Sequence, residues 1–185
     1  VAFALQDYGW YLRSDIIWHK PNPMPESVRD RPTKAHEYVF MLSKHKRYYW
    51  DQDAIREEAD RSRVGKIEFN MAGNERRSIA MGRTPSGGNE KTGQGWKRSE
   101  HRNARSVWTI PTQPFPGAHF AVMPPALADR CIRAGSALGD TVLDPFAGAG
   151  TTGMVARRLQ REFIGIELNP TFAQMARDRI ESDAP

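Results

Sequence analysis

The chain has 185 residues, of which 39% are hydrophobic and 10% aromatic, and these proportions are typical of one globular domain with an ordinary core. No apolar run approaches the ~20 residues of a membrane-spanning helix, and charges throughout residues 1–30 argue against a signal peptide. Cys131 is the only cysteine, which excludes an internal disulfide and a cysteine-based metal site and favours a cytoplasmic location.

Two short apolar runs in the N-terminal part predict strands of a buried sheet. Residues 14–19 (SDIIWH) and 37–43 (EYVFMLS) are rich in β-branched and aromatic side chains. Residues 1–13 read as the end of a helix that leads into the first of these strands. Residues 20–36 contain four prolines, which exclude a regular helix or a central strand, so we expect a long loop there.

The excess positive charge lies in one segment. Residues 61–105 hold eleven Lys and Arg against four Asp and Glu, a balance of +7, whereas the whole chain has a net charge of +5. Gly, Asn, Arg and Ser dominate from about residue 51 to 106, which is typical of a segment too polar to fold by itself. Clustered cations between Gly and Asn suit contacts with phosphates and base edges, although a solvated loop is the alternative.

Helices and strands alternate in the last third of the chain. PPALADRCIRAGS predicts a helix, TVLD a strand, residues 151–160 a second helix and FIGIE a second strand. Asn169 and the proline after it predict the start of a last helix. This alternation predicts an α/β domain with a mostly parallel sheet and helices on both of its faces.

VLDPFAGAGTTG (142–153) reads as a strand that ends at Asp144, then a glycine loop and the start of a helix. A glycine loop in this position lets a ligand approach the backbone closely and aims free N–H groups at it. The next strand ends in Glu167, 17 residues after Gly150, where a carboxylate can accept hydrogen bonds from both hydroxyls of a ribose. Nicotinamide enzymes and S-adenosylmethionine enzymes share such a unit, so the glycine pattern alone does not distinguish the two classes.

The surroundings of the loop favour S-adenosylmethionine. Asp144 is a poor neighbour for a pyrophosphate but a good partner for the methionine ammonium group. The unit also lies near the end of the chain, with one strand after it, whereas a nicotinamide-binding domain normally begins with it. A nicotinamide oxidoreductase therefore remains as the weaker alternative.

VLDPFAGAGTTG followed by FIGIELNP resembles motifs I and II of the DNA amino-methyltransferases, which methylate adenine N6 or cytosine N4. PFPGAHFAVMPPALADRCIRAGS resembles motif X of their permuted, beta class, and DIIWHKPNPMPESVRDRPTKAHEYVFMLSK resembles the segment that follows their catalytic motif. The three matches are collinear. The resemblance implies a Rossmann-like, S-adenosylmethionine-dependent methyltransferase fold of permuted order, with site-specific methylation of duplex DNA as the expected activity.

The resemblance also implies a set of cofactor-binding residues. They are Asp144, Phe146, Gly148, Gly150, Thr151, Glu167, His119 and Phe120. Glu167 takes the ribose, and Thr151 either donates to the cofactor or caps the helix. His119 and Phe120 contribute a wall, although the family usually has proline in place of Phe120 and a plain loop histidine is the alternative for His119. No metal is expected.

The same resemblance implies three parts and a set of contacts with DNA. Residues 1–50 belong to the catalytic half, 51–107 to a target-recognition insertion and 108–185 to the cofactor-binding half. The candidate DNA-binding residues are Lys20, Arg29, Arg31, Arg76, Arg77, Lys97 and Arg98. A proline-stiffened loop without a DNA contact is the alternative for residues 20–36.

One required motif is missing from the chain. Amino-methyltransferases use a tetrapeptide of the form Asp/Asn/Ser-Pro-Pro-Tyr/Phe/Trp to hold the exocyclic amine and stack on the flipped base, and no copy occurs among the 185 residues. We therefore expect the C-terminal part of a longer prokaryotic or phage enzyme, lacking N-terminal elements of the sheet, inactive by itself and able to form a homodimer. A non-catalytic DNA-binding remnant is the alternative.

Overall fold

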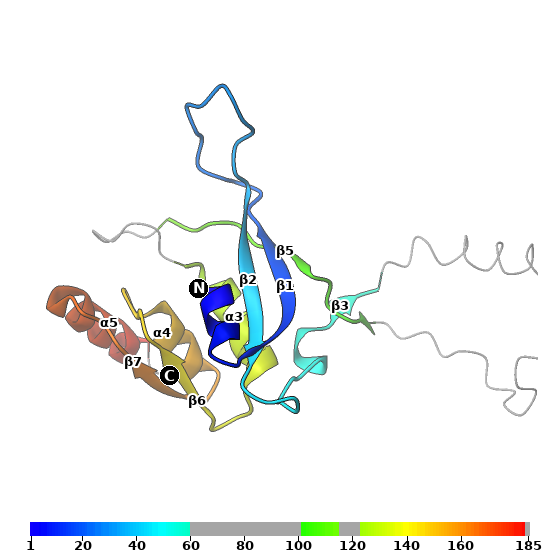
Figure 1. Ribbon diagram of the computed structural model, residues 1–185. Helices are drawn as coiled ribbons and strands as arrows, with labels where there is room; N and C mark the ends of the chain where they lie inside the picture. The colour runs from blue at the N-terminus through cyan, green and yellow to red at the C-terminus, as the bar shows by residue number, and fades with distance from the viewer. Residues whose placement is uncertain (60–100, 115–122, 184–185) are drawn as a thin grey trace, which may run out of the picture. The chain divides into compact units, whose positions relative to one another are not determined.

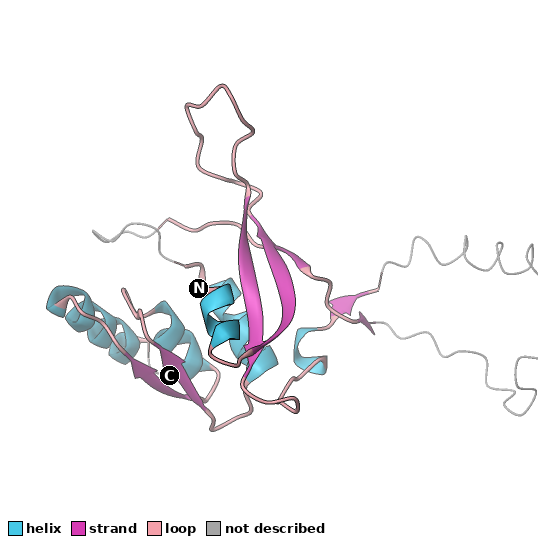
Figure 2. Ribbon diagram, in the orientation of Figure 1, coloured by secondary structure: helices cyan, strands magenta, loops and turns pink. Residues whose placement is uncertain are grey.

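A computed structural model describes residues 1–59, 101–114 and 123–183. The chain divides into two units, of which the first combines Val1–Ile55 with Ala104–Pro185 and the second is Arg56–Asn103. Figures 1 and 2 show the elements of the first unit, named here in chain order. They are α1 (Ala2–Asp7), β1 (Tyr11–His19), β2 (His36–Ser43), the 3-10 helix η1 (Asp53–Ile55), β5 (Val107–Thr109), α3 (Pro125–Gly135), β6 (Thr141–Asp144), α4 (Thr151–Arg158), β7 (Glu162–Gly165) and α5 (Pro170–Ser182).

The first sheet has the strand order β2-β1-β5. β1 pairs with β2 in antiparallel orientation and with β5 in parallel orientation, so that Trp18 lies opposite Trp108. The prediction of a mostly parallel sheet holds only in part, because β1–β5 and β6–β7 pair in parallel whereas β1–β2, the longest pairing described, is antiparallel. Residues 20–35 contain no helix and return directly to the sheet, and such a connection makes neighbouring strands antiparallel.

The second sheet joins β6 and β7 in parallel orientation, with Leu143 opposite Ile164. α4 connects the two strands, as a parallel pair requires. The helix was predicted to reach residue 160 but ends at Arg158, because Gln160 adopts a left-handed backbone conformation with φ of 59°. The predicted strand–loop–helix–strand unit is confirmed in this part of the chain.

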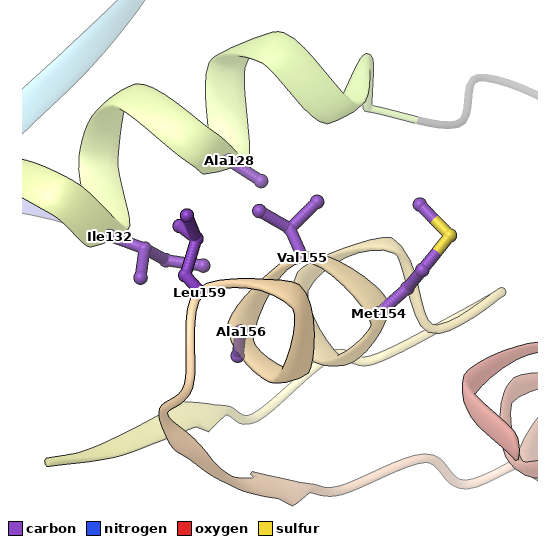
Figure 3. Packing of buried hydrophobic residues seen from close by; sticks show 6 residues of the cluster. All are labelled: Ala128, Ile132, Met154, Val155, Ala156 and Leu159. Atoms are coloured by element: carbon purple, nitrogen blue, oxygen red, sulfur yellow. The ribbon is translucent and has the colours of Figure 1, made fainter. Parts of the chain in front are cut away.

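α3 carries the core of the first unit, because its two faces pack against different partners. Leu127 packs with Ile16 and Trp18 of β1 and with Trp108 of β5. The other face packs on α4, and Figure 3 shows Ala128 and Ile132 directed toward Val155 and Leu159. The helix thereby links the β2-β1-β5 sheet to α4 and the β6-β7 sheet.

The N-terminal ends of α3 and α5 carry the residues that the sequence predicts for a helix start. Pro125 occupies the first turn of α3, where its missing N–H costs nothing. The side chain of Asn169 accepts a hydrogen bond from the backbone N–H of Thr171 at 2.9 Å and so caps α5, as predicted.

The described part of the second unit is a short antiparallel ladder of β3 (Glu57–Glu58) and β4 (His101–Arg102). An ion pair joins Arg102 Nε to Glu57 Oε2 at 3.5 Å across this ladder. The ladder therefore brings the two ends of the intervening segment together.

Candidate functional site

The glycine loop between β6 and α4 is a tight turn with two glycines in left-handed conformation. φ is 51° at Gly148 and 76° at Gly150, which directly precedes α4. The N–H of Gly150 donates to the carbonyl of Ala147 at 2.8 Å, and the N–H of Ala147 donates to the carbonyl of Ile166 at 2.9 Å. The loop is thus tied to itself and to the residue that follows β7.

Asp144 ends β6 and fastens the start of this loop. Its Oδ1 accepts a hydrogen bond from the N–H of Phe146 at 3.0 Å, and its Oδ2 accepts one from the hydroxyl of Thr152 at 2.6 Å. An ionised carboxylate offers about four lone-pair positions, so Asp144 retains acceptor capacity for a cationic ligand. The sequence reasoning missed Thr152, although a hydroxyl in the first turn of the helix was a visible signal.

Glu167 lies against the middle of the loop. Its Oε2 accepts a hydrogen bond from the N–H of Gly148 at 2.8 Å, and its Oε1 accepts one from the N–H of Asn169 at 2.9 Å. The parallel pairing of β6 and β7 places the two strand ends side by side, so the carboxylate meets the loop across 19 residues of sequence. The structure therefore brings together the loop and the acid that the sequence singled out.

A cavity of about 340 Å³ lies beside this junction. Ala147 of the loop, Gly165 at the end of β7 and the nearby Glu167 line it, and α5 contributes Ala173 and Ala176. Its volume falls within the range of roughly 300–1,000 Å³ that is usual for small-molecule sites.

Two large apolar side chains near the loop are exposed. Phe146 is 87% exposed and Leu168, directly after Glu167, is 98% exposed. An exposed apolar group next to a fixed carboxylate can cover the flat face of a ligand ring while the carboxylate binds its polar part. Sequence reasoning included Phe146 but missed Leu168, for which its place after the acid at a strand end was the available signal.

Thr151 is the first residue of α4 and is buried. The N-cap is Gly150, so Thr151 does not cap the helix as one of the two sequence readings had it. Its hydroxyl accepts a hydrogen bond from Arg179 Nη1 at 3.0 Å. Arg179 of α5 was not among the residues expected from the sequence.

A separate polar cluster lies at the ends of β1 and β5. Lys20 contacts the carboxylate of Glu37 and lies 4.6 Å from the ring centre of Trp18. The side-chain amide of Asn22 donates to the carbonyl of Thr112 at 3.1 Å and accepts from its N–H at 2.9 Å. Lys20 is thus engaged within the protein.

Of the other candidate DNA contacts, Arg31 pairs with Glu26 at 3.3 Å, and Arg29 is exposed. His119 and Phe120, predicted to form the wall of the cofactor site, lie outside the described residues, as do the candidate DNA contacts Arg76, Arg77, Lys97 and Arg98.

A second cavity, of about 460 Å³, runs along β2 and α3. Val39, Met41, Tyr49, Trp50 and Cys131 are among its lining residues. Burial raises the pKa of the Cys131 thiol to about 11, and the neighbouring Arg130 opposes this effect. The cavity contains none of the loop residues described above.

Within residues 1–59, 101–114 and 123–183, no three His, Cys, Asp or Glu side chains gather as a metal site would require. The helices of the same segments include none that is long and apolar enough to cross a membrane.

Comparison with known proteins places the chain among DNA methylases. Residues 1–178 match the model of a family described as DNA methylase, of the N6/N4 methyltransferase type. The type II methyltransferase M.SmaI of Serratia marcescens is 47% identical over 180 residues, and M.Cfr9I of Citrobacter freundii is 45% identical over 183 residues. These matches cover 97% and 99% of this chain but only 50% and 49% of the relatives, so the chain spans about half of their length.

Solved structures agree with these matches. M1.HpyAVI, solved with S-adenosylmethionine, has a TM-score of 0.62 at 22% identity and covers 96% of this chain and 66% of its own. The cytosine-N4-specific PvuII DNA methyltransferase has a TM-score of 0.62 at 18% identity and covers 98% of this chain and 58% of its own. At such identities the likeness concerns the fold.

Proposed function

We propose that this chain, which belongs to the N6/N4 DNA methylase family, forms the S-adenosylmethionine-binding part and one DNA-facing part of a type II DNA methyltransferase. The observation that carries the proposal is the contact between the Glu167 carboxylate and the Gly148 amide at the end of β6. A strand end, a glycine loop and an acid on the neighbouring strand are the parts that an adenosine cofactor needs.

The donor set of the loop fits the proposed cofactor. Glu167 retains lone pairs for the ribose hydroxyls, and Leu168 and Phe146 offer apolar surface for the adenine ring. Asp144 supplies negative charge for the methionine ammonium group, and the positive φ of Gly148 suits a residue that carries no Cβ atom. When bound, the cofactor supplies an electrophilic methyl group, and the protein contributes orientation rather than acid–base chemistry.

The three-part organisation belongs to this proposal. We assign residues 108–185 to the cofactor half, 1–50 to the catalytic half and 51–107 to target recognition, in a Rossmann-like fold of permuted order. The position of the β3-β4 ladder supports a separate insertion, since its strands begin at residue 57 and end at residue 102. Arg29 and the cations of residues 61–105 supply charge suited to the phosphates of duplex DNA.

The chemistry on the target base needs a tetrapeptide that these 185 residues lack. We therefore propose that the chain alone does not methylate DNA, and that the polypeptide corresponding to the other half of its relatives completes the enzyme. Exposed apolar side chains on the sheets support this, since Phe40 is 44% and Leu143 58% exposed. A homodimer, which sedimentation would detect, remains a prediction.

Isothermal titration of S-adenosylmethionine into the 185-residue chain tests the cofactor site. Glu167→Gln should weaken binding about 10- to 100-fold, because hydrogen bonds to a charged acceptor contribute ~1.5–3 kcal/mol. Glu162→Gln, at the exposed start of β7, is the matched control and should bind as the wild type does. Binding of NAD in place of S-adenosylmethionine would instead establish a nicotinamide enzyme.

Binding of duplex DNA, followed by fluorescence anisotropy at several salt concentrations, tests the DNA-facing part. Affinity should fall as salt rises, and Arg29→Gln should lower the salt slope by about 1. Arg133→Gln on α3, where the side chain pairs with Asp129, serves as the control.

A non-catalytic remnant is the second candidate, favoured by the missing tetrapeptide. The remnant would bind DNA but would transfer no methyl group even with the unmatched half of M.SmaI supplied.

A further inference from the structure

One face of α5 is fitted closely to the glycine loop. A Cβ atom added to Gly150 would lie 2.8 Å from the Cβ and 2.9 Å from the Cα of Ala176. One turn further along α5, Arg179 Nη1 donates to the carbonyl of Ala149 at 3.1 Å and to Thr151 Oγ1 at 3.0 Å. The side chain of Arg179 therefore reaches residues on both sides of Gly150.

The Ala149–Gly150 peptide is held at both of its polar groups, since its N–H donates to the Ala147 carbonyl at 2.8 Å and its carbonyl accepts from Arg179 at 3.1 Å. Gly148 and Gly150 flank Ala149, and glycine adopts both signs of φ at little cost, so the backbone dihedrals alone do not hold the peptide groups between them. If the Ala149–Gly150 peptide rotated, the Ala149 carbonyl would turn away from Arg179 and this hydrogen bond would break. Both hydrogen bonds come from Nη1, whose two N–H donors lie in the plane of the guanidinium, so this one nitrogen binds the carbonyl and the Thr151 hydroxyl together.

Burial and a nearby carboxylate act on the Arg179 guanidinium in opposite directions. The pKa of its guanidinium is lowered chiefly by burial, while Asp183, the residue directly after α5, partly offsets this. Asp183 in turn accepts two hydrogen bonds from Arg158 of α4, each at 2.5 Å. The Arg179 side chain is half-buried and donates to atoms of the loop. It is therefore better placed to hold the loop than to interact with solvent.

We propose that Arg179 is a positioning residue for the cofactor, holding Ala149 and Thr151 so that the Gly148 amide and the Glu167 carboxylate stay aligned for S-adenosylmethionine. The inference rests on the proposed function, but the restraint on the loop exists without any ligand. Arg179 acts through the loop rather than by contact with the cofactor.

The test combines a spectroscopic readout of the loop with cofactor affinity, in the full chain. Alanine labelled with ¹³C at the carbonyl and glycine labelled with ¹⁵N select the Ala-Gly pairs in an HNCO spectrum. The sequence has four such pairs, which end at Gly73, Gly135, Gly148 and Gly150. Arg179→Met removes the donors at similar volume, Arg179→Lys restores one cationic donor, and Arg158→Met is a matched loss of an arginine that does not touch the loop.

In Arg179→Met we expect the Gly148 and Gly150 signals to shift or broaden without ligand, while Gly135 stays unchanged. Affinity for S-adenosylmethionine should fall about tenfold or more under conditions where circular dichroism shows a folded protein. Arg179→Lys should recover part of the loss, and Arg158→Met should leave spectrum and affinity unchanged.

Unchanged Gly148 and Gly150 signals in Arg179→Met would overturn the positioning role. An affinity loss matched by an equal loss of folded protein, or reproduced by Arg158→Met, would overturn it as well. If the wild-type chain binds no S-adenosylmethionine, the proposed function fails, and the glycine signals still decide whether Arg179 restrains the loop.

Discussion

Two features of Gly150 disfavour any residue with a side chain at this position, namely its backbone conformation and its close contact with Ala176. Its φ of 76° is unfavourable for any residue with a Cβ, and the new Cβ would also meet Ala176. Gly150→Ala should lower the free energy of unfolding by about 2–4 kcal/mol, combining left-handed strain of ~1–2 kcal/mol with overpacking. Urea denaturation measures this.

Gly139 provides the matched control, since its φ is 80° and nothing lies within 4 Å of an added Cβ. Gly139→Ala should cost only the strain, about 1–2 kcal/mol. Equal losses in the two variants would show that contact with Ala176 does not constrain the loop.

The Cys131 thiol gives a pH dependence of known sign. Its pKa in the folded chain is raised to about 11 from an ordinary value of 9.0, chiefly by burial. Because the folded state then binds the proton more tightly, the thiol's contribution to stability is complete below pH 9 and is lost as pH rises through 11. The difference in unfolding free energy between wild type and Cys131→Ala should fall by an amount on the order of 1 kcal/mol between pH 9 and 11. A difference that is flat across this interval would contradict the assignment.

At the same scale, the sequence predicted some site residues better than others. Asp144 and Glu167 could be predicted to lie near the loop, because the carboxyl ends of parallel strands meet at one edge. Asp144 ends β6 as predicted, whereas β7 ends at Gly165, two residues before the predicted strand end at Glu167. Arg179 could not, because its contact with Ala149 depends on how α5 packs across 30 residues of sequence. The sequence around Arg179 does not distinguish it from an arginine on the exposed face of a helix.

At the scale of elements, α3 is the shared wall of the two hydrophobic clusters. Leu127 is 4% exposed and packs against β1 and β5. Leu127→Ala should lower the free energy of unfolding by about 2–4 kcal/mol, through lost transfer energy and the cavity left behind. Chemical denaturation followed by tryptophan fluorescence measures it.

Leu138, just after α3, is 69% exposed and supplies a control with the same chemistry. Leu138→Ala should change stability by less than about 0.5 kcal/mol. A small effect of Leu127→Ala would mean that α3 does not carry the core assigned to it.

The strands and helices were predicted closely, but the pairing of strands was not. β1 begins at Tyr11, three residues before the predicted start, and β2 begins one residue early. Strand composition reports burial and not direction, so the antiparallel pairing of β1 and β2 was invisible in their residues. The direction is set by the connecting loop. Its prolines correctly predicted a loop, but they did not predict that the loop leads back to an adjacent, antiparallel strand.

At the scale of the whole molecule, the chain combines the glycine loop proposed to bind the cofactor with sheets that leave apolar side chains exposed. Ile164 and Ile166 are 55% and 56% exposed, in or next to β7. Exposed apolar surface of this kind commonly marks an interaction site. It accords with a chain that spans about half the length of M.SmaI and with our proposal that another polypeptide segment completes the enzyme.

Hydrogen–deuterium exchange with and without S-adenosylmethionine tests most directly whether the glycine loop is the cofactor site. We predict slower exchange in peptides that cover residues 144–152 and 166–170, and no change along β2, which lines the larger cavity. Protection confined to β2 and α3, or binding without protection of the loop, would contradict the account.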